Sequence, residues 1–170
     1  FNADGYEVNP VIISPERKQQ LNQNLMLFFT GFSRFSSDIQ QTTEKALVDK
    51  QKQLLEMLSL VDDAEKVLTS KTDLNEFGRL LDYTWKLKRG ISNRISTDSI
   101  DGLYAKGMAA RALGGKLLGA GGGGFLLFYV EPDKQEAVHK AMEELLYVPF
   151  EFENSGTRVI HYTPETYEKR

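Results

Sequence analysis

The sequence predicts an α+β fold, in which a ferredoxin-like antiparallel sheet is backed by helices and carries a helical insert in its middle. Short apolar runs of strand length lie towards both ends of the 170-residue chain, and residues 125–130 form the most strand-like of them. The long stretch between these runs spaces its apolar residues as amphipathic helices do. The resulting order of strand–helix–strand, several helices, and strand–helix–strand is compatible with a ferredoxin-like sheet.

The first strand–helix–strand unit lies near the N-terminus. Residues 11–13 predict a short strand, and the proline before them suggests an edge position in the sheet. Ser14 followed by Pro15 is typical of a helix N-cap, so residues 16–22 are expected to be helical. Residues 25–30 then predict the second strand.

The helical insert follows. One helix is expected to begin at Ser37 or Asp38, and a second to span residues 49–69. In the third, Asp73 with Glu76 approximates a capping box. The apolar faces are predicted to comprise Ile39, Ala46 and Leu47 in the first helix, Leu54, Leu58, Val61 and Leu68 in the second, and Leu74, Phe77, Leu81 and Trp85 in the third.

The last helix of the insert is expected to start at Asp98 and to end at Gly114 as a C-cap. After the strand at 125–130, an amphipathic helix is predicted over 132–146. Alternating apolar residues predict a half-buried strand over 148–152. A turn at 154–156 and a final strand over 158–162 complete the predicted sheet.

Composition restricts the function classes. The net charge of −3 offers no general attraction to nucleic acid or to an anionic membrane, so neither is an expected partner. The absence of cysteine excludes disulfides, thiolate metal sites and cysteine nucleophiles, and it suits a cytoplasmic protein. We identify no membrane-spanning run and no signal peptide, and we expect a single domain over residues 1–170. Because the chain begins at Phe1 rather than methionine, we expect it to be part of a longer protein.

Seven of the fourteen glycines lie between Gly114 and Gly124, in the string GGKLLGAGGGG, and the last of them form a loop between two apolar runs. Glycine lets a backbone approach another group closely, so such a loop can turn its amides toward an anion, most often phosphate. The string is neither a Walker loop nor a dinucleotide fingerprint, because a strand rather than a helix follows it. It therefore predicts a phosphate-contacting loop, with a tight turn as the plainer interpretation.

The string LLGAGGGGF resembles the C-terminal glycine motif of the GHMP small-molecule kinases. The longer string GGKLLGAGGGGFLLFYV is most similar to the sugar-kinase branch of this family that acts on D-glycero-D-manno-heptose 7-phosphate. LMLFFTGFSR at 25–34 and ISNRIST at 91–97 add to the resemblance, which covers roughly residues 8–162.

The resemblance implies that the chain is the C-terminal domain of an ATP-dependent kinase that phosphorylates a hydroxyl of a sugar or sugar phosphate. For the branch named above, that hydroxyl is expected to be the anomeric hydroxyl of a heptose 7-phosphate. It implies that the loop against the nucleotide phosphates and the acceptor is Gly119, Ala120, Gly121, Gly122 and Gly123. The family's Pro-x-x-x-Gly-Leu-x-Ser-Ser-Ala loop is not found in this chain. ATP, Mg²⁺ and the catalytic residues are therefore expected mainly in an N-terminal domain of the same polypeptide, and the chain alone is expected to be inactive.

Further polar residues are candidates for substrate contacts. Thr30 and Arg34 follow a predicted strand, and an arginine can hold a phosphate through two hydrogen bonds. Lys116 lies inside the glycine-rich string, although each of the three also fits an ordinary surface position. A basic cluster is suited to receive a substrate phosphate, and equally to complement a helix end: Lys86, Lys88, Arg89 and Arg94. His139 and His161 stand apart from any second ligand, so no metal site is expected.

Two other functions stay open from the residues alone. One is a non-catalytic regulatory module of ferredoxin-like fold that holds a small anion in its glycine loop. The other is an assembly domain whose helical insert pairs with a second copy in a homodimer. A Ser-Ser phosphate loop encoded upstream would favour the kinase over both.

Overall fold

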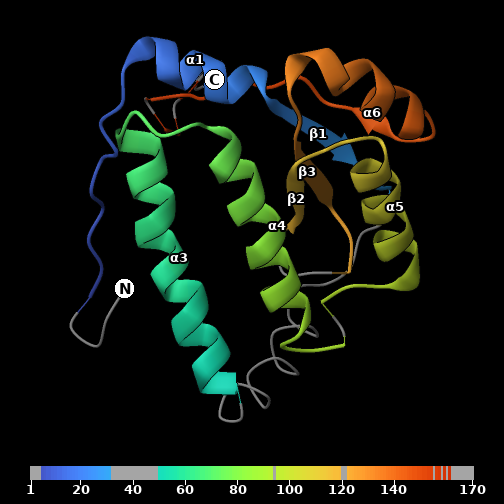
Figure 1. Ribbon diagram of the computed structural model, residues 1–170, viewed down its shortest axis with the longest axis horizontal. Coiled ribbons are helices and arrows are strands. Elements are labelled where there is room, and N and C mark those ends of the chain that lie inside the picture. Colours follow the sequence, from blue (N-terminus) through green and yellow to red (C-terminus); the bar gives the residue numbers. More distant parts are fainter. Residues whose placement is uncertain are drawn as a thin grey trace, which may run out of the picture.

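The computed structural model describes residues 5–31, 50–93, 95–119, 122–154, 156–157, 159 and 161. At its centre is a four-stranded antiparallel sheet of β1 (Leu25–Phe29), β2 (Gly114–Leu118), β3 (Phe125–Tyr129) and β4 (Leu146–Tyr147). The strand order β2-β3-β1-β4 is that of a ferredoxin-like split βαβ fold, and Figure 1 labels β1, β2 and β3. The predicted fold class is confirmed.

The helices lie on both faces of this sheet. Between β1 and β2 the chain forms the helical insert, with α3 (Gln51–Thr69), α4 (Asn75–Arg89) and α5 (Asp98–Ala109). Helices α3 and α4 pack side by side, and α4 lies against β2 and β3 (Figure 1). Helix α1 (Pro15–Gln23) precedes β1. A 3-10 turn (Pro132–Lys134) leads into α6 (Gln135–Ala141), which packs near α5. No helix in these described ranges is long and apolar enough to span a bilayer.

Each face of the sheet has its own hydrophobic core. On one face, Phe28, Leu126 and Phe128 pack with residues of α5 and α6, and Trp85 of α4 joins them. On the other, Leu25 and Tyr129 pack with Leu21 of α1 and Leu74. Because α4 contributes side chains to both clusters, it links the two cores.

Glycines allow the closest approach of helix and strand. A Cβ placed on Gly114 in β2 would lie 1.8 Å from the carbonyl oxygen of Gly78 in α4. A Cβ on Gly107 in α5 would lie 2.5 Å from the ring of Phe128. Neither contact is possible for a larger residue without a shift of the backbone or of a buried ring.

Two predicted strands are wrong. Residues 11–13 form no strand, and Ile12 is 83% exposed. The physical reason is that both edges of β1 are already paired, with β3 and with β4. The strand predicted over 148–152 is replaced by β4 and an irregular segment. There the side chain of Asn22 donates to the carbonyl oxygen of Phe150 and accepts from the amide of Phe152, each at 3.1 Å, where strand pairing was expected.

Several predicted helix boundaries and faces also need correction. Helix α5 ends at Ala109, and Arg111 rather than Gly114 adopts a left-handed φ of 75°, while Gly114 begins β2. Helix α6 ends at Ala141 instead of continuing to residue 146. In α3, Leu58 and Val61 are exposed, because the helix turns Leu54, Met57 and Val67 inward instead.

The remaining predictions differ in outcome. The N-cap at Ser14 is confirmed, since its hydroxyl accepts from the amide of Arg17. The capping box is wrong, because Asp73 accepts from the amide of Asn75 and the carboxylate of Glu76 turns to Arg79. The helix expected to include Ile39 lies outside the described residues, as does most of the strand expected over 158–162.

Candidate functional site

The glycine loop joins β2 to β3 at one end of the sheet, where Leu118 pairs with Phe125. Gly119, Gly122 and Gly124 have φ values of 95°, 73° and 110°, in the left-handed region that glycine adopts without a steric penalty. Ala120 and Gly121 lie outside the described residues. The loop therefore needs glycine at these three positions for conformational reasons alone, whatever else it contacts.

Hydrogen bonds fasten this loop to three neighbouring segments. The ammonium group of Lys88, in the last turn of α4, donates to the carbonyl oxygen of Gly119 at 2.8 Å. The amide of Gly122 donates to the carbonyl oxygen of Ile95 at 3.0 Å. The carbonyl oxygen of Gly124 accepts from the amide and from the hydroxyl of Thr30, both at 2.9 Å. Gly119, Gly122 and Gly124 are thus fastened to α4, to the turn before α5 and to the end of β1.

These contacts also limit which amides can meet an anion. Gly122 is buried and its amide is already paired with Ile95, so in this conformation it is not available to a phosphate. Gly119 is exposed, and a Cβ built on it would meet nothing within 4 Å. Contact of a phosphate with Gly119, Ala120, Gly121 or Gly123 stays a prediction.

Lys116 lies in the middle of β2, opposite Leu127 and two residues before Leu118. It is half-buried, and burial lowers the pKa of its ammonium group. Burial is also the main reason why the pKa of Lys88 is lowered, and the positive charge of Lys116 lowers it further. The two lysines of the sequence prediction are therefore electrostatic neighbours beside the glycine loop.

The rest of the predicted basic cluster is neutralised or not described. Lys86 pairs with Asp82 at 2.6 Å, and Asp82 also accepts from the hydroxyl of Tyr104 at 2.8 Å. Arg89 pairs with Asp101 at 2.5 Å. Arg94 and Arg34 lie outside the described residues. Of this set, only Lys88 is described without a carboxylate partner.

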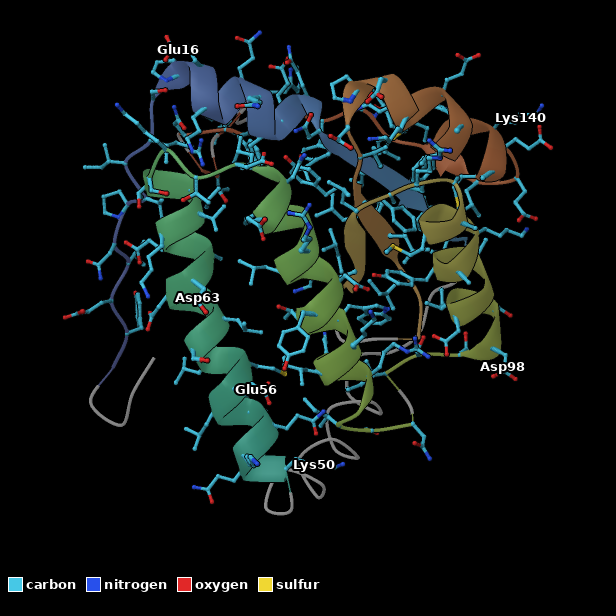
Figure 2. The ribbon with its side chains drawn as sticks, viewed as in Figure 1. Glu16, Lys50, Glu56, Asp63, Asp98 and Lys140 are labelled. Carbon is cyan, nitrogen blue, oxygen red and sulfur yellow. The ribbon has the colours of Figure 1, made fainter. Side chains whose placement is uncertain are left out.

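Thr30 is buried beneath the glycine loop and also borders a cavity of about 330 Å³. The other walls of this cavity come from α5 and from the segment before β4, including Leu103, Lys106 and Glu144. Asp98, which Figure 2 labels at the start of α5, is another of its lining residues. Thr30 thus contacts the glycine loop and at the same time lines a cavity large enough for a small molecule.

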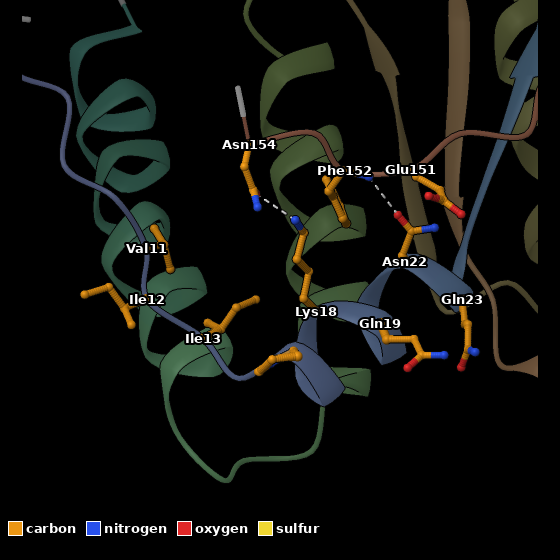
Figure 3. Close-up of a pocket in the computed structure, with 11 residues that line it drawn as sticks. Val11, Ile12, Ile13, Lys18, Gln19, Asn22, Gln23, Glu151, Phe152 and Asn154 are labelled. Carbon is orange, nitrogen blue, oxygen red and sulfur yellow. Dashed lines mark hydrogen bonds between the residues drawn. The ribbon is translucent and has the colours of Figure 1, made fainter. Parts of the chain in front are cut away.

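A larger cavity, about 720 Å³, lies elsewhere (Figure 3). It is bounded by residues 11–13, by α1 and by residues 151–154, where the ammonium group of Lys18 donates to Asn154 at 2.8 Å. Helix α1 leads into Leu25, which pairs with Tyr129 at the end of the sheet opposite to the glycine loop. Nothing in the sequence pattern pointed to this cavity, because it forms between segments far apart in the chain.

Histidine and carboxylate positions do not gather into a metal site within the described ranges, where no group of three or more His, Asp or Glu has ligand geometry. His139 packs against the rings of Phe28 and Tyr147, with centroid distances of 5.8 and 4.6 Å. Its surroundings are those of a core residue.

The chain resembles known kinases over most of its length. The family model described as GHMP kinases C terminal matches residues 60–148. The D-glycero-alpha-D-manno-heptose 7-phosphate kinase of Campylobacter jejuni subsp. jejuni is 32% identical over 162 residues, which cover 93% of this chain and 48% of the relative. The chain thus spans about half the length of that protein.

Solved structures show the same fold. The mevalonate kinase of Methanococcus jannaschii superimposes with a TM-score of 0.65 at 22% identity, over 80% of this chain and 42% of that one. The mevalonate kinase of L. major, solved in complex with R-mevalonate, gives a TM-score of 0.61 at 23% identity, over 71% and 37% of the two chains. At these identities the likeness is one of fold.

Proposed function

The chain belongs to the GHMP kinases, as a C-terminal domain of that family, and from this premise we propose that it is the C-terminal half of an ATP-dependent sugar kinase. The γ-phosphoryl group of ATP passes to a hydroxyl of a sugar or sugar phosphate. The acceptor we propose is the anomeric hydroxyl of a heptose 7-phosphate, since the chain is 32% identical to a kinase named for that substrate.

The observation that carries this proposal is the fastened glycine loop. In phosphoryl transfer the protein takes little part in covalent chemistry. Its contribution is to position the reacting groups and to stabilise negative charge in the transition state. The loop is held from three sides by Lys88, Ile95 and Thr30, and its residue Gly119 faces open space. A loop of small residues leaves room for the reacting phosphoryl group, while the nearby lysines supply positive charge.

The proposal divides the work between two domains. ATP and Mg²⁺ are bound mainly by an N-terminal domain of the same polypeptide, and this chain closes the active site from the other side. Mg²⁺ would neutralise charge on the transferred phosphoryl group.

Two experiments test the kinase proposal. The coding sequence upstream of Phe1 is expected to encode the Ser-Ser phosphate loop. The full-length polypeptide is expected to consume ATP with a heptose 7-phosphate and to do so poorly with mevalonate. An upstream sequence without that loop, together with no ATP consumption on any sugar or sugar phosphate, would leave the non-catalytic anion-binding module as the better explanation.

A variant of the loop separates its role in the reaction from its role in the fold. Gly121→Val in the full-length polypeptide is expected to abolish most turnover while the circular dichroism spectrum stays unchanged, because a branched side chain would occupy the space proposed for the phosphoryl group. Lys66→Met is the control, since Lys66 is an exposed residue of α3 paired with Asp63. Wild-type turnover in the Gly121→Val variant would contradict the proposed position of the loop.

A homodimer through the helical insert is a separate proposal. Leu55, Leu58 and Val61 lie on the exposed side of α3, with exposed fractions of 59%, 65% and 60%. Such an apolar stripe favours contact with a second copy. Light scattering of the full-length polypeptide is expected to give twice the monomer mass, and Leu58→Glu is expected to restore the monomer. A monomeric wild type would contradict the proposal.

A further inference from the structure

Two lysines from different elements converge beside the glycine loop. Lys88 reaches from the last turn of α4 to the carbonyl oxygen of Gly119. Lys116 is in β2, and side chains alternate along a strand, so Lys116 lies on the same sheet face as Leu118. Lys88 therefore contacts the chain only three residues beyond Lys116. Burial lowers the pKa of Lys88, and the positive charge of Lys116 lowers it further.

The charge of this pair is not balanced by the described chain. The neighbouring cations Lys86 and Arg89 each contact a carboxylate, Asp82 and Asp101 respectively. No carboxylate of the described residues lies within 4.0 Å of Lys88 or Lys116. Both lysines are half-buried, and burial disfavours a charged ammonium group unless a partner compensates it. Two adjacent, partly desolvated cations without a counter-charge are the arrangement expected of an anion site before its ligand binds.

The usual structural explanation does not account for both residues. A lysine in the last turn of a helix complements the negative end of the helix dipole, which explains Lys86 and Arg89. Lys88 instead donates to Gly119, outside its own helix. Lys116 is on a strand and has no helix end to complement. A ligand that carries negative charge explains the position of both.

We propose that Lys88 and Lys116 form a two-lysine receptor for a phosphate group, with Gly119 at its edge. Lys88 has three N–H donors, of which one is used by Gly119, so it can donate to a phosphate without releasing the loop. Ligand binding would then be transmitted to the glycine loop through the same ammonium group. The proposal rests on the proposed kinase function only for the source of the phosphate, which is either the nucleotide or an acceptor that carries its own phosphate ester.

The first test measures binding without turnover. The full-length polypeptide is labelled with trace acetic anhydride, and the acetylation rate of each lysine is read by mass spectrometry, with inorganic phosphate or with sodium chloride at matched ionic strength. Phosphate is expected to slow acetylation of Lys88 and Lys116 several-fold and to leave exposed Lys66 unchanged. If the acetylation rates of Lys88 and Lys116 were the same in phosphate as in sodium chloride, the receptor proposal would be overturned.

The second test identifies the source of the phosphate. Lys116→Met and Lys88→Met are expected to raise a KM about tenfold or more, as loss of a hydrogen bond to a charged group does, with Lys116→Arg recovering most of it. A raised KM for the sugar phosphate alone assigns the pair to the acceptor, and a raised KM for ATP alone assigns it to the nucleotide. Changes below twofold in both, with kcat retained, would overturn the receptor while leaving the kinase intact.

The two proposals fail in different ways. If the wild-type polypeptide transfers no phosphoryl group to any sugar but phosphate still protects the two lysines, the kinase proposal is wrong and the receptor stands. If phosphoryl transfer occurs but phosphate protects neither lysine and neither KM changes in the variants, the receptor proposal is wrong and the kinase proposal stands. Thermal unfolding of each variant, measured in parallel, identifies any loss of binding that comes from a damaged fold.

Discussion

The ammonium groups of Lys116 and Lys88 are both half-buried, and no carboxylate of the described chain lies within ion-pair distance of either. Lys116→Met keeps the aliphatic stem and removes one charge. We expect it to raise the free energy of unfolding at neutral pH, within the roughly 0.5–2 kcal/mol typical of stabilising substitutions. Urea unfolding at a series of pH values measures the gain.

The pH dependence of that gain has a definite sign. The pKa of Lys116 is lower in the folded than in the unfolded chain, so the folded state disfavours the charged form. The cost is complete below the folded pKa and disappears as pH rises toward the unfolded value near 10.5. The advantage of Lys116→Met should therefore shrink as the pH rises into the alkaline range. A gain independent of pH would mean that packing, not charge, is responsible.

The same substitution, glycine to alanine, is expected to have opposite effects on stability at two positions. Gly114→Ala would place a methyl group 1.8 Å from the backbone of α4, whereas a Cβ on Gly102 in α5 meets nothing within 4 Å. Gly114→Ala is expected to cost about 3 kcal/mol or more, since backbone must move in a packed core. Gly102→Ala is expected to gain roughly 0.5–1 kcal/mol from helix propensity. Thermal unfolding compares the two variants, and similar melting temperatures would contradict the observed packing.

At this scale the sequence identifies residue types better than their partners. Lys116 and Thr30 were predictable candidates because each adjoins a strand or glycine motif. The hydrogen bonds of Gly122 with Ile95 and of Lys88 with Gly119 were not predictable. Each joins two segments that are about 30 residues apart in the sequence and meet only in the folded chain. Periodicity carries no information on such contacts.

Helices α1 and α3 are joined through one side chain. The guanidinium group of Arg17 donates to the carbonyl oxygens of Leu68 and Thr72, each at 2.7 Å, and also to that of Val67. These carbonyls belong to the end of α3 and the turn after it, which lack intrahelical donors. Arg17→Met is expected to cost roughly 1.5–3 kcal/mol, the range for hydrogen bonds to a charged group.

A matched variant controls for the loss of a surface charge. Arg79 pairs with Glu76 within α4, and both side chains are about half exposed. Arg79→Met should cost no more than about 1 kcal/mol, as exposed ion pairs do. Chemical denaturation of both variants measures the difference. Equal losses would mean that Arg17 acts as a surface charge and not as a cap of α3.

The elements that sequence reasoning placed correctly carry strong local signals. Ser14 and Pro15 mark the start of α1, and the apolar run at β1 is bounded by Asn24 and Thr30. The errors occur where tertiary contacts decide. Residues 11–13 have strand-like composition, but both sides of β1, the next strand in the chain, are already paired with β3 and β4. The segment after β4 leaves the sheet where the side chain of Asn22 forms hydrogen bonds with the carbonyl oxygen of Phe150 and the amide of Phe152.

For the molecule as a whole, the order of elements was enough to suggest a ferredoxin-like sheet, but not which face each helix covers. That arrangement depends on close packing at Gly78, Gly107 and Gly114, where helix and strand meet. The same packing gives α4 a share in both cores. Trp85 belongs to one cluster, whereas Phe77 and Leu81 pack against the other.

This sharing predicts that the chain unfolds as one cooperative unit. Leu74 belongs to the core opposite to that of Trp85 and is 2% exposed. Leu74→Ala is expected to cost roughly 2–5 kcal/mol, as buried leucine truncations do. Because a single domain unfolds in an all-or-none transition, the loss should shift the unfolding midpoint seen by Trp85 fluorescence as much as that seen by far-ultraviolet circular dichroism. Val8→Ala, at a residue that is 83% exposed, should shift neither by more than about 0.5 kcal/mol. If Leu74→Ala moved the circular dichroism midpoint while Trp85 kept its own, the two faces of the sheet would be separate folding units, and α4 would not couple the glycine loop to the core behind it.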